Sequence, residues 1–157
     1  RQIYVVYPLI KESEKLDLKN VENGYGLLKQ VFARYSISMV HGKMKPAEKE
    51  KIMLDFSEHR VDILVATSVV EVGVNVPNAT NIIIEGSERF GLAQLHQLRG
   101  RVMRSSHQPY CYLFADAKSE KTQERMKVFI KAKNGFELAE YDHTFKTSYL
   151  KSLLRST

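Results

Sequence analysis

The stretch from Gln94 to Arg104 (QLHQLRGRVMR) carries side chains whose types and spacing suit the binding of an anion. In a helix, Arg101 and Arg104 are three residues apart and share a face, and Gln97 lies one turn before Arg101 on the same side. Two guanidinium groups on one face can grip a triphosphate or a DNA backbone, because each presents a planar fork of donors. A surface helix with salt bridges is the alternative, but no Asp or Glu lies between Arg89 and Arg104. The sequence therefore predicts that these arginines bind an anion supplied from elsewhere.

A second stretch, Ala66–Pro77 (ATSVVEVGVNVP), begins where a predicted buried strand ends. Thr67 and Ser68 place hydroxyl and amide donors at that strand end, and such donors suit phosphate oxygens. Gly73 permits a close approach of another group or an unusual turn, and Pro77 ends the element. An alternative interpretation is that Thr67 and Ser68 only cap a helical turn.

The total charge is a weaker indication than the placement of the arginines. The 157 residues hold 24 Lys and Arg against 18 Asp and Glu, a formal charge of +6. A basic balance is typical of nucleic-acid-binding domains, but the chain has no basic block. Residues 61–115 are neutral overall, and three of their four basic residues are Arg99, Arg101 and Arg104. This placed cluster, rather than the +6, favours a phosphate-binding function.

The sequence lacks the motifs of a complete catalytic or metal site. It has no G-x-x-x-x-G-K-[ST] phosphate loop, no G-x-G-x-x-G fingerprint, no H-E-x-x-H zinc motif and no G-x-S-x-G elbow. The histidines show no ligand spacing, so no metal site is predicted. The single cysteine, Cys111, excludes an internal disulfide framework and a four-cysteine zinc site. No apolar run approaches the ~20 residues of a membrane span, so we expect a cytoplasmic protein without a membrane partner.

Short β-rich runs alternate with helical periodicity along the chain. Strands are predicted at Ile3–Tyr7, Ile37–Val40, Val61–Ala66, Asn81–Glu85 and Tyr110–Phe114. Helices are predicted up to Arg34 (with a start left open by Gly24 and Gly26), from Pro46 through Phe56, at Gly91–Val102 and at Lys121–Lys133. This alternation predicts an α/β domain with a mainly parallel sheet, whose ligands bind beyond the carboxyl ends of the strands.

Three motifs in this order resemble those of superfamily 2 helicases and translocases. HGKMKPAEKEKIMLDF is similar to the segment before motif V, ATSxxExGxNxP resembles motif V, and QxxGRxxR resembles motif VI. Motifs V and VI together mark the second of two RecA-like motor domains in that superfamily. The resemblance implies a RecA-like three-layer α/β sandwich with a mainly parallel central sheet.

Longer stretches narrow the resemblance to the RecG family of bacterial ATP-dependent DNA helicases, which act on branched DNA. They are YVVYPLIKESEKLDL, VHGKMKPAEKE, VGVNVPNAT, ERFGLAQLHQLRGRV and HQPYCYLF, and the similarity runs from Gln2 to Asp142. The expected organisation is a helicase C-terminal domain at residues 1–115, a helical extension at 116–142 and a divergent tail at 143–157. Branched or duplex DNA and the first RecA-like domain of the same protein are the implied partners, in the bacterial cytoplasm.

In this family ATP with Mg²⁺ binds between the two motor domains, and the first supplies the phosphate loop and the magnesium-binding acids. The resemblance implies that Arg101 and Arg104 meet the γ-phosphate with support from Gln97, and that Arg104 is the arginine finger. Such a residue is worth ~10³–10⁵ in rate. Because half of the site would lie in the first domain, this chain alone is expected to hydrolyse no ATP.

The resemblance also assigns the remaining motif residues. Glu71, Gly73, Asn75 and Gly100 would lie beside the nucleotide. His41, Gly42, Thr67 and Ser68 are the candidates for contacts with the DNA backbone. DNA binding of this kind is dominated by phosphate contacts, weakens with salt and reads little sequence.

Three departures from the family pattern are visible. Asn75 replaces the usual Asp, and its amide can still form hydrogen bonds. Met103 replaces the usual Gly, which would cost ~1–2 kcal/mol if that position needs a positive φ and nothing if the helix continues. HTFKTSYLKSLLRST, at 143–157, replaces the arginine- and glycine-rich continuation that links ATP use to movement in the family.

Two other functions stay open, the first of them because of these departures. One is a degenerate, non-enzymatic helicase-like module that binds nucleic acid or a partner. The other is a domain of the transcription-repair coupling translocase, which shares a stretch similar to ERFGLAQLHQLRGR.

Overall fold

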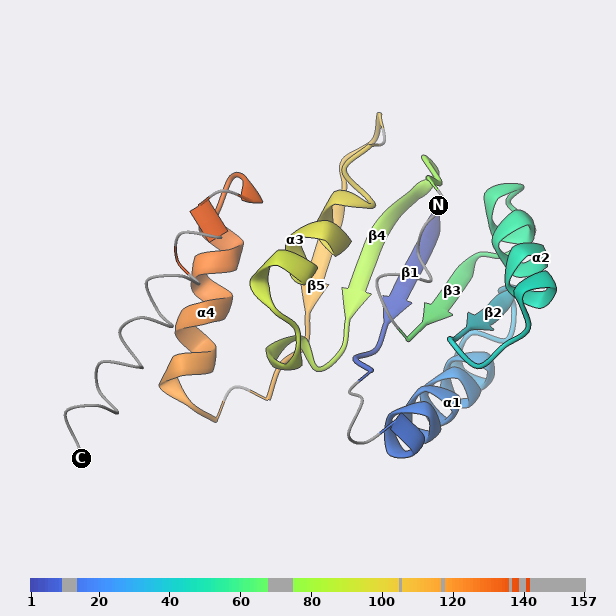
Figure 1. Ribbon diagram of the computed structural model, residues 1–157. Coiled ribbons are helices and arrows are strands. Elements are labelled where there is room, and N and C mark those ends of the chain that lie inside the picture. The colour runs from blue at the N-terminus through green and yellow to red at the C-terminus, as the bar shows by residue number, and fades with distance from the viewer. Residues whose placement is uncertain are drawn as a thin grey trace.

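The computed structural model describes residues 1–9, 14–67, 75–104, 106–116, 118–135, 137, 138 and 141, and for 14–17 the backbone alone. All five strands form one parallel sheet in the order β2-β3-β1-β4-β5 (Figure 1). The strands are β1 (Gln2–Val6), β2 (Ile37–Val40), β3 (Ile63–Ala66), β4 (Ala79–Ile84) and β5 (Tyr110–Leu113). The helices are α1 (Glu14–Val31), α2 (Pro46–Ser57), the short η3 (Ser87–Arg89), α3 (Leu92–Gly100) and α4 (Glu120–Lys131).

Alternate residues of each strand face opposite sides of the sheet, and each side has its own core. On one side, Tyr4, Leu64 and Ile82 belong to a buried cluster that also contains residues of α2, α3 and α4. On the other side, Val5 and Val65 pack with residues of α1. In Figure 1 α1 and α2 lie at the β2 end of the sheet, and α3 and α4 at the β5 end. The structure therefore has the predicted three-layer α/β architecture with a parallel central sheet.

Predicted and observed elements agree in type, and most of their bounds differ by one or two residues. The largest difference is α1, which begins at Glu14 and passes through both Gly24 and Gly26. A Cβ at Gly24 would lie 2.1 Å from the Tyr7 hydroxyl, whereas a Cβ at Gly26 would meet nothing within 4 Å. Gly24 therefore gives the Tyr7 side chain room against the helix, a reason that the local sequence does not reveal.

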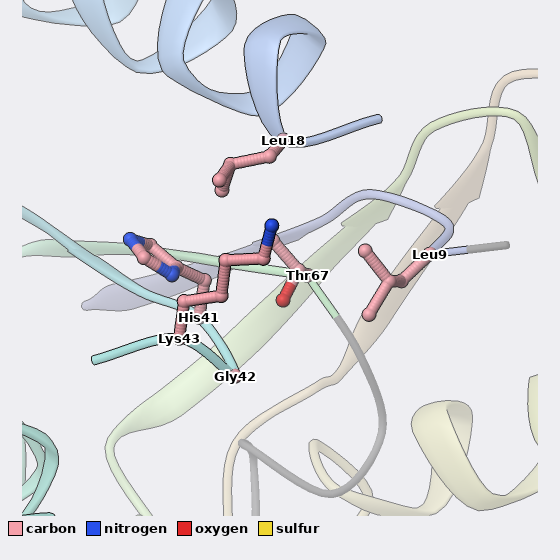
Figure 2. A pocket seen from close by; sticks show the side chains of 6 residues that line it. All are labelled: Leu9, Leu18, His41, Gly42, Lys43 and Thr67. Atoms are coloured by element: carbon pink, nitrogen blue, oxygen red, sulfur yellow. The ribbon is translucent and has the colours of Figure 1, made fainter. Parts of the chain in front are cut away.

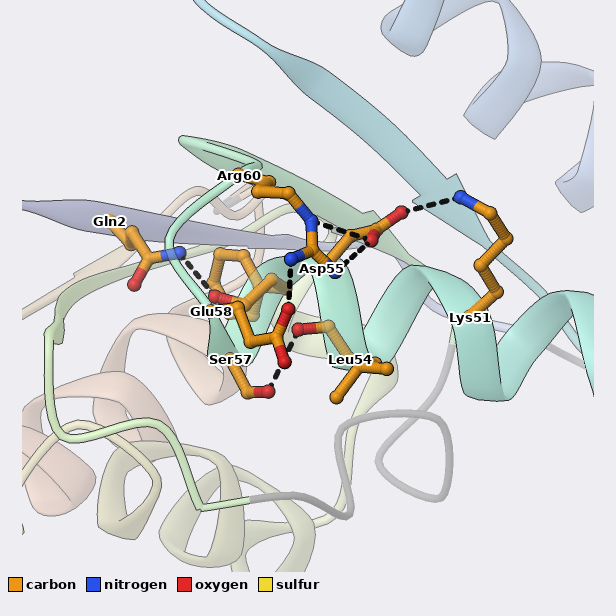
Figure 3. A network of polar contacts seen from close by, with 8 residues as sticks. Gln2, Lys51, Leu54, Asp55, Ser57, Glu58 and Arg60 are labelled. Atoms are coloured by element: carbon orange, nitrogen blue, oxygen red, sulfur yellow. Dashed lines mark hydrogen bonds and ion pairs between the residues drawn. The ribbon is translucent and has the colours of Figure 1, made fainter.

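A polar network fastens the end of α2 to the start of β1 (Figure 3). The buried Gln2 amide donates to the carbonyl oxygens of Phe56 and Val61, at 2.6 Å each, and accepts a hydrogen bond from Asn78 at 3.0 Å. These bonds use both ends of the amide, so its burial leaves neither end unpaired. Asp55, near the end of the same helix, accepts hydrogen bonds from Lys51 and Arg60.

Two further results concern the described residues alone. Among them no helix is both long enough and apolar enough to cross a membrane. Within the same residues no three His, Cys, Asp or Glu side chains gather where they could hold a metal ion.

Candidate functional site

The predicted anion-binding arginines follow directly on α3. The helix ends at Gly100, and the backbone N–H of Arg101 donates to the carbonyl of Leu98 at 3.0 Å, which tightens the last turn. The predicted helix Gly91–Val102 therefore begins one residue too early and ends two residues too late. Arg101 is half-buried, whereas Arg104 lies exposed in the turns that follow.

Three neighbouring positions show that one face of this end of α3 is open to solvent. The Gln97 side chain is exposed, and a Cβ added at Gly100 would meet nothing within 4 Å. Met103 is 57% exposed and is not among the described residues with a positive φ. Methionine is therefore accommodated without backbone strain, although the α-helix does not continue to this position.

Arg99 does not belong with the other two arginines of the sequence cluster. Its Nη1 donates to the carbonyl of Phe129 at 3.0 Å, and its guanidinium lies 4.5 Å from the Phe129 ring centroid. Nη2 also lies 3.2 Å from Nδ1 of His96. Phe129 is in the last turn of α4, where backbone carbonyls lack helical partners. The expectation that all three arginines need an external anion is wrong for Arg99. Its acceptor is a backbone carbonyl, which a search of the sequence for acidic neighbours does not find.

A second arginine completes the contact between the two helices from the opposite side. Arg125 of α4 donates to the carbonyls of Glu88 and Phe90, at 3.1 and 2.8 Å, in the segment that leads into α3. Arg99 of α3 thus holds the backbone of α4, and Arg125 of α4 holds the backbone of the segment that precedes α3. The α3–α4 contact therefore fixes both ends of the helix from which Arg101 and Arg104 extend.

The other predicted residues gather at the carboxyl ends of β2 and β3. His41, Gly42 and Thr67 line one hollow of about 10 Å³, the space of a single water molecule (Figure 2). Lys43 borders the same hollow, and Leu9 and Leu18 complete its lining. The register explains the meeting, because Val40 pairs with Ala66 and so the residues that follow emerge side by side.

Two polar atoms at this hollow are buried without a hydrogen-bond partner among the described residues. They are Oγ1 of Thr67, a residue with no exposed surface, and Nδ1 of His41. A buried polar group without a partner costs about 1–3 kcal/mol. Such groups in one hollow, beside the Lys43 side chain, are suited to an anionic oxygen from outside the chain.

The structure describes only some of the remaining predicted residues. Ser68, Glu71 and Gly73 lie outside the described residues. Asn75 is exposed and precedes β4.

Topology separates the two groups of candidates. Because β4 and β5 are parallel, α3 runs from the carboxyl end of β4 back toward the amino end of β5, and the arginines follow α3. His41 and Thr67 stand instead at the carboxyl ends of β2 and β3. The structure thus presents two distinct candidate surfaces, one with guanidinium groups and one with hydroxyl, imidazole and ammonium groups.

Sequence reasoning missed the lining residues Lys43, Leu9 and Leu18. Lys43 follows the His41-Gly42 pair directly, so its position at the hollow could have been predicted from that pair. Leu9 reaches the hollow from the segment after β1 and Leu18 from α1, and only the fold reveals that.

Comparison with known proteins places the fold among helicase domains. Residues 1–106 match the family described as "Helicase conserved C-terminal domain". The chain is 50% identical over 143 residues to "ATP-dependent DNA helicase RecG" of Bacillus subtilis, which covers 90% of this chain and 21% of the relative. It is 48% identical over 142 residues to the Thermotoga maritima protein of the same name, with 90% and 18% covered. The chain therefore spans about one fifth of the length of these relatives.

Solved structures agree. The chain matches "Structure of RecG bound to three-way DNA junction" with a TM-score of 0.74 and 44% identity, over 90% of this chain and 18% of that one. It matches "Structure of the C-terminal domain of the DEAD-box protein Dbp5" with a TM-score of 0.54 and 15% identity, over 83% and 71%. The second likeness supports the fold alone.

Proposed function

Because the chain belongs to the helicase conserved C-terminal domain family, we propose that it is the second motor domain of an ATP-dependent DNA helicase or translocase that acts on branched DNA. The observation that carries the proposal is the exposure of Gln97 and Arg104, two residues of the QxxGRxxR motif, on a domain 50% identical to RecG proteins. The exposed Arg104 guanidinium can reach a ligand bound outside the chain.

The donor set at the end of α3 fits a triphosphate. Arg101 and Arg104 offer only N–H donors, and the Gln97 amide adds further donors. We assign Arg104 as the arginine finger because it is the more exposed of the two arginines. ATP supplies the phosphoryl group whose transfer drives the motor. The first RecA-like domain would supply the phosphate loop and hold the Mg²⁺. Asn75 and Gly100, with Glu71 and Gly73, are the proposed nucleotide-side residues of this chain.

The hollow at the carboxyl ends of β2 and β3 is the proposed contact with the DNA backbone. Thr67 can donate its hydroxyl proton to a phosphate oxygen, and Lys43 adds a positive charge beside it. His41 and Gly42 line the same hollow, and Ser68 is proposed there from the sequence. Because phosphate contacts dominate, binding should weaken steeply as salt rises. A division at residue 115 between the domain and its helical extension stays a prediction.

The test uses the full-length protein that contains this chain, with forked DNA as activator. Arg104→Ala should lower DNA-stimulated phosphate release by at least about a thousandfold, the contribution of an arginine finger. Arg34→Ala, which removes an exposed arginine near the end of α1, is the matched control and should retain the full rate. The isolated chain should hydrolyse no ATP.

Three outcomes would redirect the proposal. An Arg104→Ala protein with its full ATPase rate contradicts the arginine-finger role. A parent protein without ATPase on any DNA supports the non-enzymatic module. A requirement for RNA polymerase rather than a DNA branch would instead favour the transcription-repair coupling translocase.

A further inference from the structure

The Tyr4 hydroxyl is a buried polar group that the fold itself does not use. Tyr4 lies in the middle of β1 with no exposed surface, and its Oη has no hydrogen-bond partner among the described residues. The backbone register places Tyr4 between Leu64 of β3 and Ile82 of β4, and both are fully buried aliphatic residues. The two strand neighbours of Tyr4 therefore offer its hydroxyl no side-chain partner.

Packing alone would be served by phenylalanine at this position. The Tyr4 ring contacts the Phe56 ring edge-to-face, with centroids 4.9 Å apart and planes at 62°. That contact needs the ring and not the hydroxyl. Because an unpaired buried hydroxyl weakens the folded state, its presence calls for a partner in another state of the protein.

The end of α3 lies over the same core cluster as Tyr4. Leu98 and Val102 are buried members of that cluster, and Arg101 lies between them in sequence. Burial raises the pKa of Tyr4 to about 12, and the positive charge of Arg101 opposes that rise. The raised pKa means that the phenol stays protonated at neutral pH.

We propose that Tyr4 is a positioning residue for Arg101: when the motor domains close on the nucleotide, its hydroxyl oxygen accepts a hydrogen bond from the guanidinium and aims that group at the triphosphate. The inference rests on the proposed function and extends it to a residue of the central strand. A guanidinium has donors only, whereas a neutral phenol has lone pairs to accept them, so the pair is chemically matched.

The test compares Tyr4→Phe with the unmodified full-length protein in DNA-stimulated ATP hydrolysis. The kcat should fall about tenfold, the effect of one charged hydrogen bond on the barrier, while the KM for ATP stays within a factor of two or so. The midpoint of urea unfolding should stay unchanged or rise, because the substitution removes an unpaired buried hydroxyl. A purely structural hydroxyl would give the opposite pattern.

Tyr25→Phe is the matched control. The Tyr25 hydroxyl donates to the Ile37 carbonyl at 3.3 Å on the opposite side of the sheet. Its loss should leave kcat unchanged. In an Arg101→Ala background, Tyr4→Phe should change the residual rate less than about twofold, because the group it positions is gone.

Separate outcomes test the inference and the function on which it rests. If Arg104→Ala is inactive while Tyr4→Phe retains the full kcat, the role of Tyr4 is overturned and the proposed function stands. A lower unfolding midpoint with unchanged kcat also overturns it, as does a tenfold loss that persists in the Arg101→Ala background. If Arg104→Ala is fully active, or the parent protein has no ATPase, the proposed function fails and the inference fails with it.

Discussion

The α3–α4 contact and the hollow beyond β2 and β3 treat buried polar groups in opposite ways. At the helix contact, Arg99 and Arg125 donate through their Nη atoms to backbone carbonyls of the facing element, and Arg99 Nε alone lacks a partner among the described residues of that contact. At the hollow, Thr67 Oγ1 and His41 Nδ1 lack partners among the described residues. Groups of the first kind hold the fold together, whereas groups of the second kind are available to a ligand. The Tyr4 hydroxyl belongs with the second kind although it lies deep in the core.

This difference shows why residue type alone does not identify a site. Arg99, Arg101 and Arg104 stand within six positions of sequence and have no acidic neighbours there. The structure nevertheless divides them, because Arg99 meets the last turn of α4 while Arg104 remains exposed. The last carbonyl oxygens of a helix are free to accept hydrogen bonds, and a count of charged residues in the sequence does not include them.

The largest effect on stability is expected for Arg99→Ala. The substitution removes a charged hydrogen bond and a cation–π contact with Phe129, so the free energy of unfolding should fall by about 3 kcal/mol. Urea denaturation of the chain followed by circular dichroism measures this loss. Arg99→Lys keeps the charge but not the fork, and it should recover part of the loss. Equal stability of Arg99→Ala and the unmodified chain would place Arg99 with the ligand-binding arginines instead.

The fold was largely predictable because its strands are short apolar runs separated by helical periodicity. Element types followed from that pattern, and the parallel sheet followed from their alternation. The start of α1 was not predictable, because only the Tyr7 contact explains Gly24. Among the site residues, Thr67 could be proposed from its place at a strand end. Tyr4 could not, since a tyrosine within an apolar strand is indistinguishable in sequence from an ordinary core residue.

A smaller effect, and one on binding rather than stability, is expected for Thr67→Val. Valine keeps the shape of the side chain but removes the unpaired hydroxyl, so the unfolding midpoint should hold or rise slightly. Loss of one hydrogen bond to a phosphate should weaken forked-DNA binding by the full-length protein about tenfold at low salt. Fluorescence anisotropy measures the affinity. A variant that loses stability while keeping its DNA affinity would show that Thr67 supports the fold and does not bind DNA.

The smallest effect is expected at Asp55, a fold-supporting group at the protein surface. Hydrogen bonds from Lys51, and next from Arg60, hold the pKa of the Asp55 carboxyl below its usual value. A lowered pKa means that the stabilisation is complete above about pH 4, the ordinary value of an aspartate, and is lost as the pH falls through the folded-state pKa. The stability advantage over Asp55→Asn should thus be constant from pH 7 to about 4 and shrink below it.

Urea midpoints of the two proteins across this range, repeated at about 1 M salt, complete the comparison. Salt should reduce the advantage at neutral pH, because surface pairs are screened. The Arg99 contribution should survive the same salt, because its main acceptor is a neutral carbonyl in a partly buried contact. An Asp55 advantage that persisted undiminished at pH 3 would mean that packing, and not the two cations, gives the residue its role. Hydrogen-bond partners alone would then not separate the polar groups that support the fold from those available to a ligand, and the burial of each side chain would also have to be considered.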